Sequence, residues 1–462
     1  MELLNDFSAG EFGDARLSCR LEAIGRRLVA APEKSFPGAM QTEADLEGLY
    51  RFVNNKAVSK EGILRPHFRE TLLRAGDASE FIVAHDTTEF GFTTAREGLG
   101  RVTDKGRGFF AHTSLVISGD DRGEPMGVLE LATFIRKGAP RRKQKRHSEY
   151  RPEAERESRR WWESVQAVEE RLQRPGVAIH VAEREADSYV LLSRLIAATY
   201  RFVLRIRADR VLDDPEAVKR SKLFESMAGL RMRVEREVAV SERKKKGSKA
   251  HPPREARIAA LEIAAGMVTL RVPSSRPNVE DELPKTIKVN VVHVREVNCP
   301  PDCTPVDWKL MTMEPIDTVE QILKVVDAYR KRWRIEEFFK ALKSCCKVEE
   351  VQLESLDGIL NALALYVPVA CLLLRVRQAA REPFSRPATE VLSALQIELL
   401  EVHDDVRLPP NADAKTAYLG IARLGGHLKR NGPPGFIILA RGLLQLLTLE
   451  QGAALALRRR KM

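Results

Sequence analysis

The chain has 462 residues, of which 44% are hydrophobic and 31% charged, and its formal net charge at pH 7 is +11. This composition is typical of a folded chain with several domains and excludes a disordered protein. The basic excess favours a polyanionic partner, because clustered Lys and Arg attract phosphate oxygens. It gathers in three segments, each of which on its own is typical of a solvated loop: Arg136 to Arg151, Arg243 to Lys249 and Arg458 to Lys461.

The N-terminus has neither the basic nor the apolar region of a signal peptide, and the longest uncharged run, Leu360 to Leu374, is shorter than a membrane span. We therefore expect a cytoplasmic protein with no membrane partner. Its 6 cysteines are too few and too scattered for a disulfide framework. Cys299 and Cys303 with His293 could contribute to a zinc site, but reduced structural thiols are the simpler interpretation.

The first 78 residues carry helical periodicity and predict a small helical module. Strand-like runs follow at Phe81 to Asp86, His112 to Ser118 and Met126 to Ile135, the last two joined by a turn at Gly119 to Gly123. Three strands in succession predict an antiparallel meander. The first of them ends in an acid.

A helix from Pro152 to Leu172 is expected next, and then a buried strand, Val177 to Glu183, which also ends in an acid. A helix through Tyr189 and Leu195 and a strand from Arg201 to Arg207 follow. From residue 208 to 316 the pattern is alternating and β-rich without intervening helices. We interpret this stretch as an insertion.

A helix from Thr318 to Ser344, with Thr318 as its N-cap, precedes a helical C-terminal part. This order of elements predicts an α/β chain with an RNase H-like core, in which helices flank a mixed five-stranded sheet. The expected segments are an N-terminal helical module (1–78), the first part of the core (79–207), the β-rich insertion (208–316), the last part of the core (317–371) and a helical C-terminal segment (372–462).

Four residues of the predicted helix, Tyr329, Arg332, Glu336 and Lys343, are spaced so that they fall on one helical face. Arg and Lys bind phosphate oxygens, and Glu is a hard oxygen ligand for magnesium or manganese. The face therefore suits phosphoryl transfer on DNA. Its residue types alone are equally typical of a solvated helix with an apolar back.

Acids at the ends of the first and fourth core strands and on the last core helix can converge on two metal ions in this kind of sheet. Here those acids are Asp86, Glu183 and Glu336. Two ions would hold the attacking and leaving oxygens of an in-line displacement at phosphorus.

With these residues in place, the chain resembles the DDE-type transposases of bacterial cut-and-paste transposons and insertion sequences, in the subgroup marked by Tyr-x2-Arg-x3-Glu-x6-Lys. Tyr329, Arg332, Glu336 and Lys343 meet this motif in full. The similarity extends over nearly the whole chain, through His85-Asp-Thr-Thr88, Asp104-Lys-Gly-Arg-Gly108 with His112, Glu183-Arg-Glu-Ala-Asp187, Trp308 and Ala422-Arg-Leu-Gly-Gly426.

The resemblance implies a role for each part. Residues 1–78 would recognise transposon ends, the core would cut DNA, and residues 372–462 would form a homodimer in the DNA complex. Asp86, Glu183 and Glu336 would be catalytic and bind two Mg²⁺ or Mn²⁺ ions, with no organic cofactor. Tyr329, Arg332 and Lys343 would bind phosphates.

Trp308 would stack on a base flipped out of the duplex, although its residue type alone is also typical of a core tryptophan. His85 and His112 are expected to be packed or hydrogen-bonded rather than catalytic.

The implied reaction has four phosphoryl transfers on double-stranded DNA. Water nicks a transposon end, the freed 3′ hydroxyl forms a hairpin, water reopens it, and the 3′ end joins target DNA. The protein would associate with the nucleoid when it is bound to DNA.

Position 183 departs from the family pattern, which has Asp where this chain has Glu. Three interpretations remain: Glu183 reaches the metal, Glu185 replaces it, or the protein is a catalytically impaired or repurposed DNA-binding protein. A plain metal-dependent nuclease without strand transfer is a further alternative.

Overall fold

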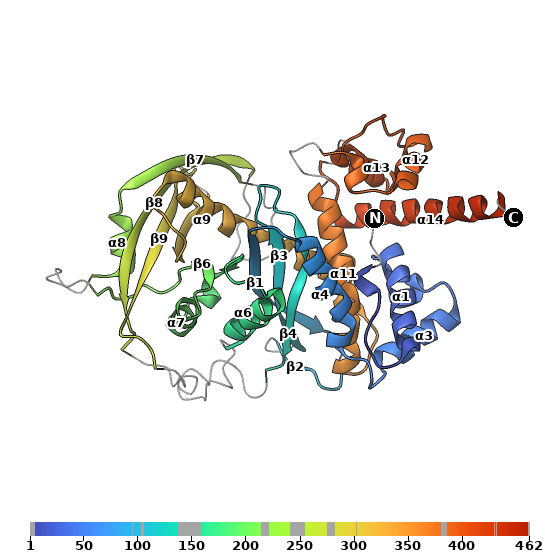
Figure 1. Ribbon diagram of the computed structural model, residues 1–462, viewed down its shortest axis with the longest axis horizontal. Coiled ribbons are helices and arrows are strands. Elements are labelled where there is room, and N and C mark those ends of the chain that lie inside the picture. The colour runs from blue at the N-terminus through green and yellow to red at the C-terminus, as the bar shows by residue number, and fades with distance from the viewer. Residues whose placement is uncertain are drawn as a thin grey trace. The chain divides into compact units, whose positions relative to one another are not determined.

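The computed structural model describes the chain in two compact units. The residues described are 5–94, 96–102, 106–136, 159–213, 221–240, 255–274, 282–301, 303–379, 386–428, 430 and 432–460. The first unit comprises Met1–Phe81, Thr87–Ala139 and Trp333–Met462, and the second comprises Ile82–Asp86 and Pro140–Arg332. Figure 1 labels the elements of both units.

The first unit begins with a helical segment that packs on a long buried helix. Its helices are η1 (Asn5–Phe7), α1 (Ala15–Ala30), α2 (Phe36–Ala39), α3 (Glu43–Val53) and α4 (Lys60–Ala75). Asp14, Thr42 and Ser59 cap α1, α3 and α4 by accepting backbone hydrogen bonds in the first turn. The N-terminal helical region is thus confirmed.

The long helix α11 (Leu356–Ala379) forms the centre of this unit and contacts α3, α4 and β4. Its Asn361 side chain donates hydrogen bonds to the carbonyls of Val53 and Val58, at 2.9 and 3.1 Å. By length and composition α11 and α14 could each cross a membrane, but 89% of the apolar window of α11 is buried within the protein, against 33% for α14. We therefore assign α11 to the core. The boundary expected at residue 372 falls inside it.

The remaining helices of the first unit are α10 (Trp333–Lys340), the π-helical turn η5 (Ala341–Cys345), η6 (Val348–Glu350), η7 (Ala388–Glu390), α12 (Ala394–Val402), α13 (Ala414–Leu424) and α14 (Phe436–Arg460). Helices α13 and α14 approach closely at two glycines. A Cβ on Gly425 would lie 2.0 Å from the Ile438 carbonyl oxygen, and one on Gly442 would lie 1.7 Å from that of Ile421. Gly425 of the Gly-Gly motif therefore has a packing role, whereas Gly426 adopts a left-handed φ of +85° beside open space.

The strands of this unit are β1 (Phe81–Phe92), β2 (Gly100–Arg101), β3 (Arg107–Ser118) and β4 (Pro125–Phe134). Their order is β2-β3-β1, and β4 pairs antiparallel with β3. Gly108 allows β3 to approach β1, since a Cβ there would lie 1.8 Å from the Phe90 carbonyl oxygen. Part of the motif that begins at Asp104 lies outside the described residues.

The second unit shares β1, of which it includes Ile82–Asp86. Its further strands are β5 (Ala178–Ala182), β6 (Arg201–Arg205), β7 (Met232–Val240), β8 (Arg257–Arg271), β9 (Thr286–Val297) and β10 (Asp307–Thr312). They follow the order β1-β5-β6-β10-β9-β8-β7. Strands β5 and β6 are parallel, and each later neighbouring pair, from β6/β10 to β8/β7, is antiparallel. The mixed α/β architecture is confirmed. The β-rich insertion extends the core sheet through β10, which widens it beyond the five strands expected.

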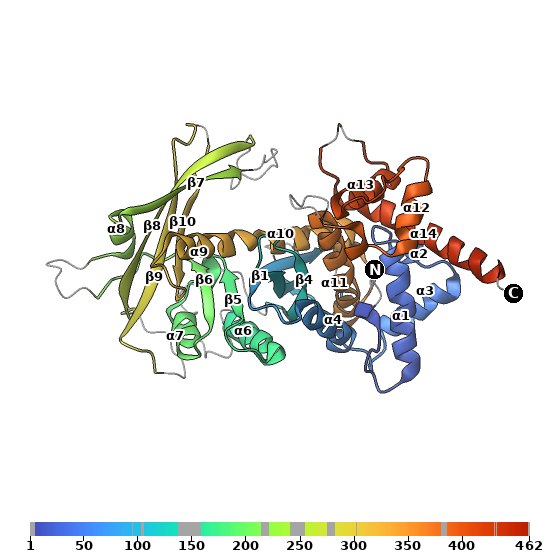
Figure 2. The ribbon, with the colours of Figure 1, turned by 45° about the horizontal axis from the view of Figure 1, so that its top comes forward.

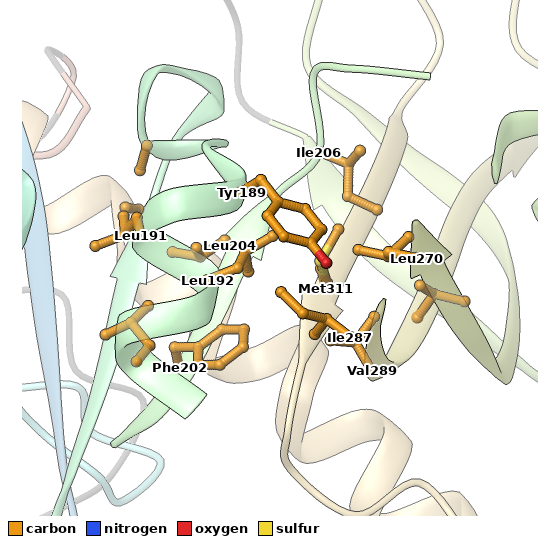
Figure 3. Packing of buried hydrophobic residues seen from close by; sticks show 14 of the residues in the cluster. Tyr189, Leu191, Leu192, Phe202, Leu204, Ile206, Leu270, Ile287, Val289 and Met311 are labelled. Carbon is orange, nitrogen blue, oxygen red and sulfur yellow. The ribbon is translucent and has the colours of Figure 1, made fainter. Parts of the chain in front are cut away.

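Helices cover the two faces of this sheet. They are α6 (Arg159–Leu172), η4 (Arg184–Ala186), α7 (Tyr189–Ala197), α8 (Leu223–Ala228) and α9 (Val319–Lys331). On one face Leu191 and Leu192 of α7 pack against Phe202 and Leu204 of β6, and Met311 of β10 joins the same cluster (Figure 3). Helix α9 lies against β5, β6 and β9 (Figure 2).

The predicted helix from Thr318 to Ser344 is interrupted, which corrects the expectation of one continuous helix. Thr318 does cap it, in a capping box with Gln321. However, α9 ends at Lys331, and Arg332 is its C-cap. The unit boundary falls between Arg332 and Trp333. Of the expected helix from Pro152, the residues before Arg159 lie outside the described part of the chain.

A buried ionic cluster fixes the N-terminal segment within the first unit. Asp6 contacts His67 Nδ1 at 2.5 Å and accepts hydrogen bonds from both terminal nitrogens of Arg74, at 2.8 and 2.9 Å. Burial alone would raise the pKa of Asp6, but the charge of His67 and hydrogen bonds from His67 and Arg74 hold it well below its usual range. Asp6 is therefore ionised in the folded protein at neutral pH.

We expect Asp6→Ala to lower the free energy of unfolding of this unit by about 2–4 kcal/mol, because it removes the carboxylate partner of the half-buried Arg74 and of the buried His67. The loss should shrink as the pH falls below 3.8, the usual Asp pKa, because there the unfolded wild type takes up a proton that native Asp6 does not bind. Urea unfolding at pH 7 and at about pH 2.5 would measure it. The matched control is Asp14→Ala at the exposed N-cap of α1, which should cost much less.

Candidate active site

Strand geometry points the first two predicted acids to the same face of the sheet. His85 and Asp86 are neighbours in β1, so their side chains point to opposite faces. His85 contacts His180, which in turn contacts Glu169 of α6, so this pair lies on the α6 face. Glu183 follows β5 in an extended conformation three residues after His180. Asp86 and Glu183 therefore both point to the α9 face.

One guanidinium group links these two carboxylates. Arg332 Nη2 lies 3.0 Å from Glu183 Oε1, and Arg332 Nη1 lies 3.9 Å from Asp86 Oδ2. Arg332 is 6% exposed, whereas the side chains of Asp86 and Glu183 are 26% and 24% exposed, so the two ion pairs are partly shielded from water. The structure therefore brings Asp86, Glu183 and Arg332 together, as the sequence predicts.

Tyr329 and Arg205 complete the surroundings of Glu183. The Tyr329 hydroxyl donates a hydrogen bond to Glu183 Oε1 at 2.5 Å, and Arg205 Nη1 lies 3.3 and 3.4 Å from the two carboxylate oxygens. Trp308 of β10 contacts Tyr329 edge to face, with ring centroids 5.3 Å apart. Tyr329 thus lies beside Glu183, and Trp308 lies beside Tyr329. Arg205 is a site residue that the sequence interpretation missed.

The electrostatics of the site set the protonation states of its two central groups. Burial would raise the pKa of Glu183, but the Arg332 charge, the Tyr329 hydroxyl and Arg205 hold it below its ordinary value. Burial and the neighbouring Glu183 charge raise the pKa of Tyr329 well above its usual range. At neutral pH Glu183 is therefore ionised and Tyr329 is a protonated donor.

The other acids of the Glu183-Arg-Glu-Ala-Asp187 motif have different partners. Glu185 has a 67% exposed side chain and pairs with Arg160 at 3.4 Å. Asp187 is buried, pairs with Arg210 at 2.6 Å and accepts hydrogen bonds from the backbone of Arg207 and Ala208. The position of Glu185 argues against its replacing Glu183.

The last two predicted residues belong to the first unit. Glu336 is partly buried on α10. The Lys343 ammonium donates to the Glu89 carbonyl and lies 5.2 Å from the centroid of the Phe90 ring. Their roles stay predictions, because the site described above is built from residues of the second unit alone.

The donors of the site fit a hard divalent cation. Asp86 and Glu183 supply carboxylate oxygens, which Mg²⁺ and Mn²⁺ prefer, and their combined charge already holds the Arg332 guanidinium. Within the described ranges no cluster of three or more His, Cys, Asp or Glu side chains is placed to bind a metal. Asp86 and Glu183 do not form such a cluster by themselves, so their binding of an ion, with Glu336 as a third ligand, stays a prediction.

The zinc alternative has no support in the described residues. His293 Nε2 lies 2.9 Å from Asp307 Oδ1, and Cys299 Sγ contacts an Arg257 nitrogen at 3.6 Å. His85 and His112 are both buried, and His112 Nδ1 lies 2.9 Å from the Thr87 hydroxyl. These histidines have structural partners, as expected.

Two acids on neighbouring strands, one within β1 and one directly after β5, surrounded by guanidinium groups and an aromatic pair, have the composition of a metal-dependent phosphoryl-transfer site. Comparison with protein families gives the particular class. A transposase DDE domain matches residues 132–374, more than half of the chain, and a transposase DNA-binding domain matches residues 3–58. The chain therefore belongs to the DDE-domain transposase family. The first match includes Glu183, Trp308 and Arg332 but begins after Asp86.

Among solved structures the chain is similar to a piggyBac transposase synaptic complex with hairpin DNA, at 9% sequence identity and a TM-score of 0.33. The similarity covers 69% of this chain and 51% of that one, so it spans about half the length of the neighbour.

The ion pairs of Arg332 lead to a pH-dependent prediction. Arg332→Met keeps much of the volume but leaves Asp86 and Glu183 facing each other without the cation. We expect a loss of about 3–5 kcal/mol in the free energy of unfolding at pH 8. The loss should be smaller near pH 4.5, because without Arg332 the pKa of Glu183 rises and its protonation relieves the repulsion.

Urea unfolding at the two pH values would measure this difference. Arg330→Met on the same helix is the control, because Arg330 forms a more exposed pair with Asp327 at 3.1 Å and should contribute little. Equal losses at both pH values for Arg332→Met would contradict the assigned ion pairs.

Proposed function

We propose that this protein is a cut-and-paste transposase that nicks transposon ends, forms and resolves a hairpin, and joins the freed end to target DNA. The observation that carries the proposal is the contact of Arg332 with both Asp86 and Glu183, beside Tyr329. Family membership supplies the reaction class. The protein would act in the cytoplasm, associated with the nucleoid when it is bound to DNA.

The residues of the chain would divide the work by their chemistry. Arg332, Arg205 and Lys343 are cations that bind phosphate oxygens, and Tyr329 donates a hydrogen bond from a fixed hydroxyl. Asp86, Glu183 and Glu336 would hold two Mg²⁺ or Mn²⁺ ions, which when bound supply charge neutralisation at the reacting phosphate. Trp308 offers an aromatic face for an unpaired base beside Tyr329.

The contacts of Glu183 support the interpretation that Glu is the working residue at this position. Its carboxylate lies within reach of Tyr329, Arg205 and Arg332 at the same time. Aspartate would withdraw the carboxylate by one methylene and lengthen all three contacts. The site therefore suits the longer side chain.

The ends of the chain would bind DNA and a second subunit. Residues 3–58 match a transposase DNA-binding domain, and Arg16, Arg20 and Arg26 are exposed on α1. These cations suit the phosphates of terminal inverted repeats. The C-terminal helix α14 exposes Ile437, Leu449 and Leu455, which supports a homodimer formed by residues 372–462.

The test is an assay with Mg²⁺ and a duplex that carries the inverted repeats flanking the gene. Hairpin and joined products would support the proposal. Binding without cleavage would point instead to a repurposed DNA-binding protein, and nicks without joining to a plain nuclease.

The same assay tests position 183. We expect Glu183→Asp to nick about a hundredfold more slowly, because a displacement of about 1 Å has this effect on aligned reactants. Glu183→Ala should be slower still, and Glu185→Ala should nick like the wild type because Glu185 pairs with Arg160 outside the site. Wild-type nicking by Glu183→Ala would exclude Glu183 as a metal ligand.

A further inference from the structure

We propose that Glu169, His180 and His85 form a positioning chain that sets the distance between Asp86 and Glu183 and thereby tunes the affinity of the site for divalent ions. The inference rests on the proposed function, because it concerns the same two carboxylates. It adds three residues that lie on the opposite face of the sheet from the acids.

The hydrogen bonds that link Glu169, His180 and His85 are continuous, short and buried. Glu169 Oε1 of α6 lies 2.8 Å from His180 Nε2 of β5, and His180 Nδ1 lies 2.8 Å from His85 Nε2 of β1. The exposed fractions are 8% for Glu169 and 1% for each histidine. Three neighbouring elements are thus tied together where water does not compete for the hydrogen bonds.

If Glu169 is a carboxylate and both histidines are neutral, one arrangement of protons satisfies both contacts. The Glu169 carboxylate accepts from His180 Nε2–H, which leaves His180 Nδ1 as an acceptor. His85 Nε2–H then donates to that nitrogen. In this arrangement the Glu169 carboxylate sets which nitrogen of each ring donates a hydrogen bond and which accepts one. Each ring is thereby held in one tautomer and one orientation.

The Glu169–His180–His85 hydrogen bonds join β1 and β5, the strands that carry Asp86 and Glu183. His85 is the residue before Asp86, and His180 lies three residues before Glu183 in the neighbouring strand. A hydrogen bond between the two rings ties β1 to β5 at the residue before Asp86 and three residues before Glu183. Loss of this bond would let the strands adjust and change the distance between Asp86 and Glu183.

The location in an otherwise apolar layer also argues for a positioning role. Residues next to the hydrogen-bonded residues, such as Val165 of α6 and Phe202 of β6, which pairs with His180 in the sheet, are buried hydrophobics. An apolar trio could fill the same space without burying a carboxylate. Partners behind metal ligands commonly change metal affinity or activity by about 10–100-fold when removed.

The test is a titration of the full chain, without DNA, with MnCl₂, in which electron paramagnetic resonance measures free Mn²⁺. His180→Phe keeps the ring volume beside Tyr200 but removes both hydrogen bonds. We expect Mn²⁺ to bind it at least about tenfold more weakly. Glu169→Gln keeps an oxygen that accepts from His180, so its affinity should stay within twofold of the wild type.

A matched control separates positioning from general loosening. Leu192→Ala creates a cavity in the core of the same unit without touching the chain, so it should lower the unfolding midpoint and leave Mn²⁺ affinity unchanged. Glu169→Leu is the second test variant if His180→Phe does not fold, and it should also weaken binding about tenfold.

Each outcome decides the inference. Mn²⁺ binding by His180→Phe or Glu169→Leu within twofold of the wild type would overturn it, and so would an equal loss in Leu192→Ala. A wild type whose Mn²⁺ binding is absent, or is unaffected by Asp86→Asn, would overturn the proposed metal site and this inference with it. Failure of the proposed function is therefore visible in the wild type and in Asp86→Asn, before the positioning variants are compared.

Discussion

The site depends on the burial of Arg332 between two carboxylates. Two like charges that face the same side of a sheet repel each other, and burial strengthens the repulsion because little water screens it. The guanidinium offsets both charges, at 3.0 Å from Glu183 and 3.9 Å from Asp86. The Arg332 charge helps to hold the pKa of Glu183 below its ordinary value, and an ionised carboxylate is what metal binding requires.

The sheet of the second unit connects this ionic face with the rest of the unit. Its α9 face carries the charges, and its other face carries the Glu169–His180–His85 chain and the apolar cluster around α7. The β-rich insertion takes part directly, because β10 pairs with β6 and places Trp308 beside Tyr329. Arg205 of β6 joins both parts, since it contacts Glu183 and donates to the Asp307 carbonyl.

Much of this arrangement is predictable from local sequence patterns. Apolar runs that end in Asp86 and Glu183 locate two buried strands, although β1 does not end at Asp86 as expected but continues to Phe92. The spacing of Tyr329 and Arg332 places them together near the end of α9. The contribution of Arg205 is not visible in this way, because it depends on which strand pairs with β5. The same is true of β10 and β6, which are separated by about a hundred residues of sequence and pair only through the tertiary fold. The interruption at Arg332 also escapes the periodicity, since helical spacing continues through it.

The charge balance of the site favours binding of a metal ion and a DNA phosphate together over binding of either one alone. Two carboxylates, Asp86 and Glu183, face two guanidinium groups, Arg332 and Arg205, so the described site is close to neutral. A DNA phosphate that engages Arg332 would withdraw a positive charge from the acids, and a divalent ion that engages the acids would release Arg332. Either ligand alone leaves a buried charge poorly compensated, whereas both together restore the balance. Under the proposed function, metal and DNA should therefore favour each other's binding, and Arg332 is the residue through which that coupling passes.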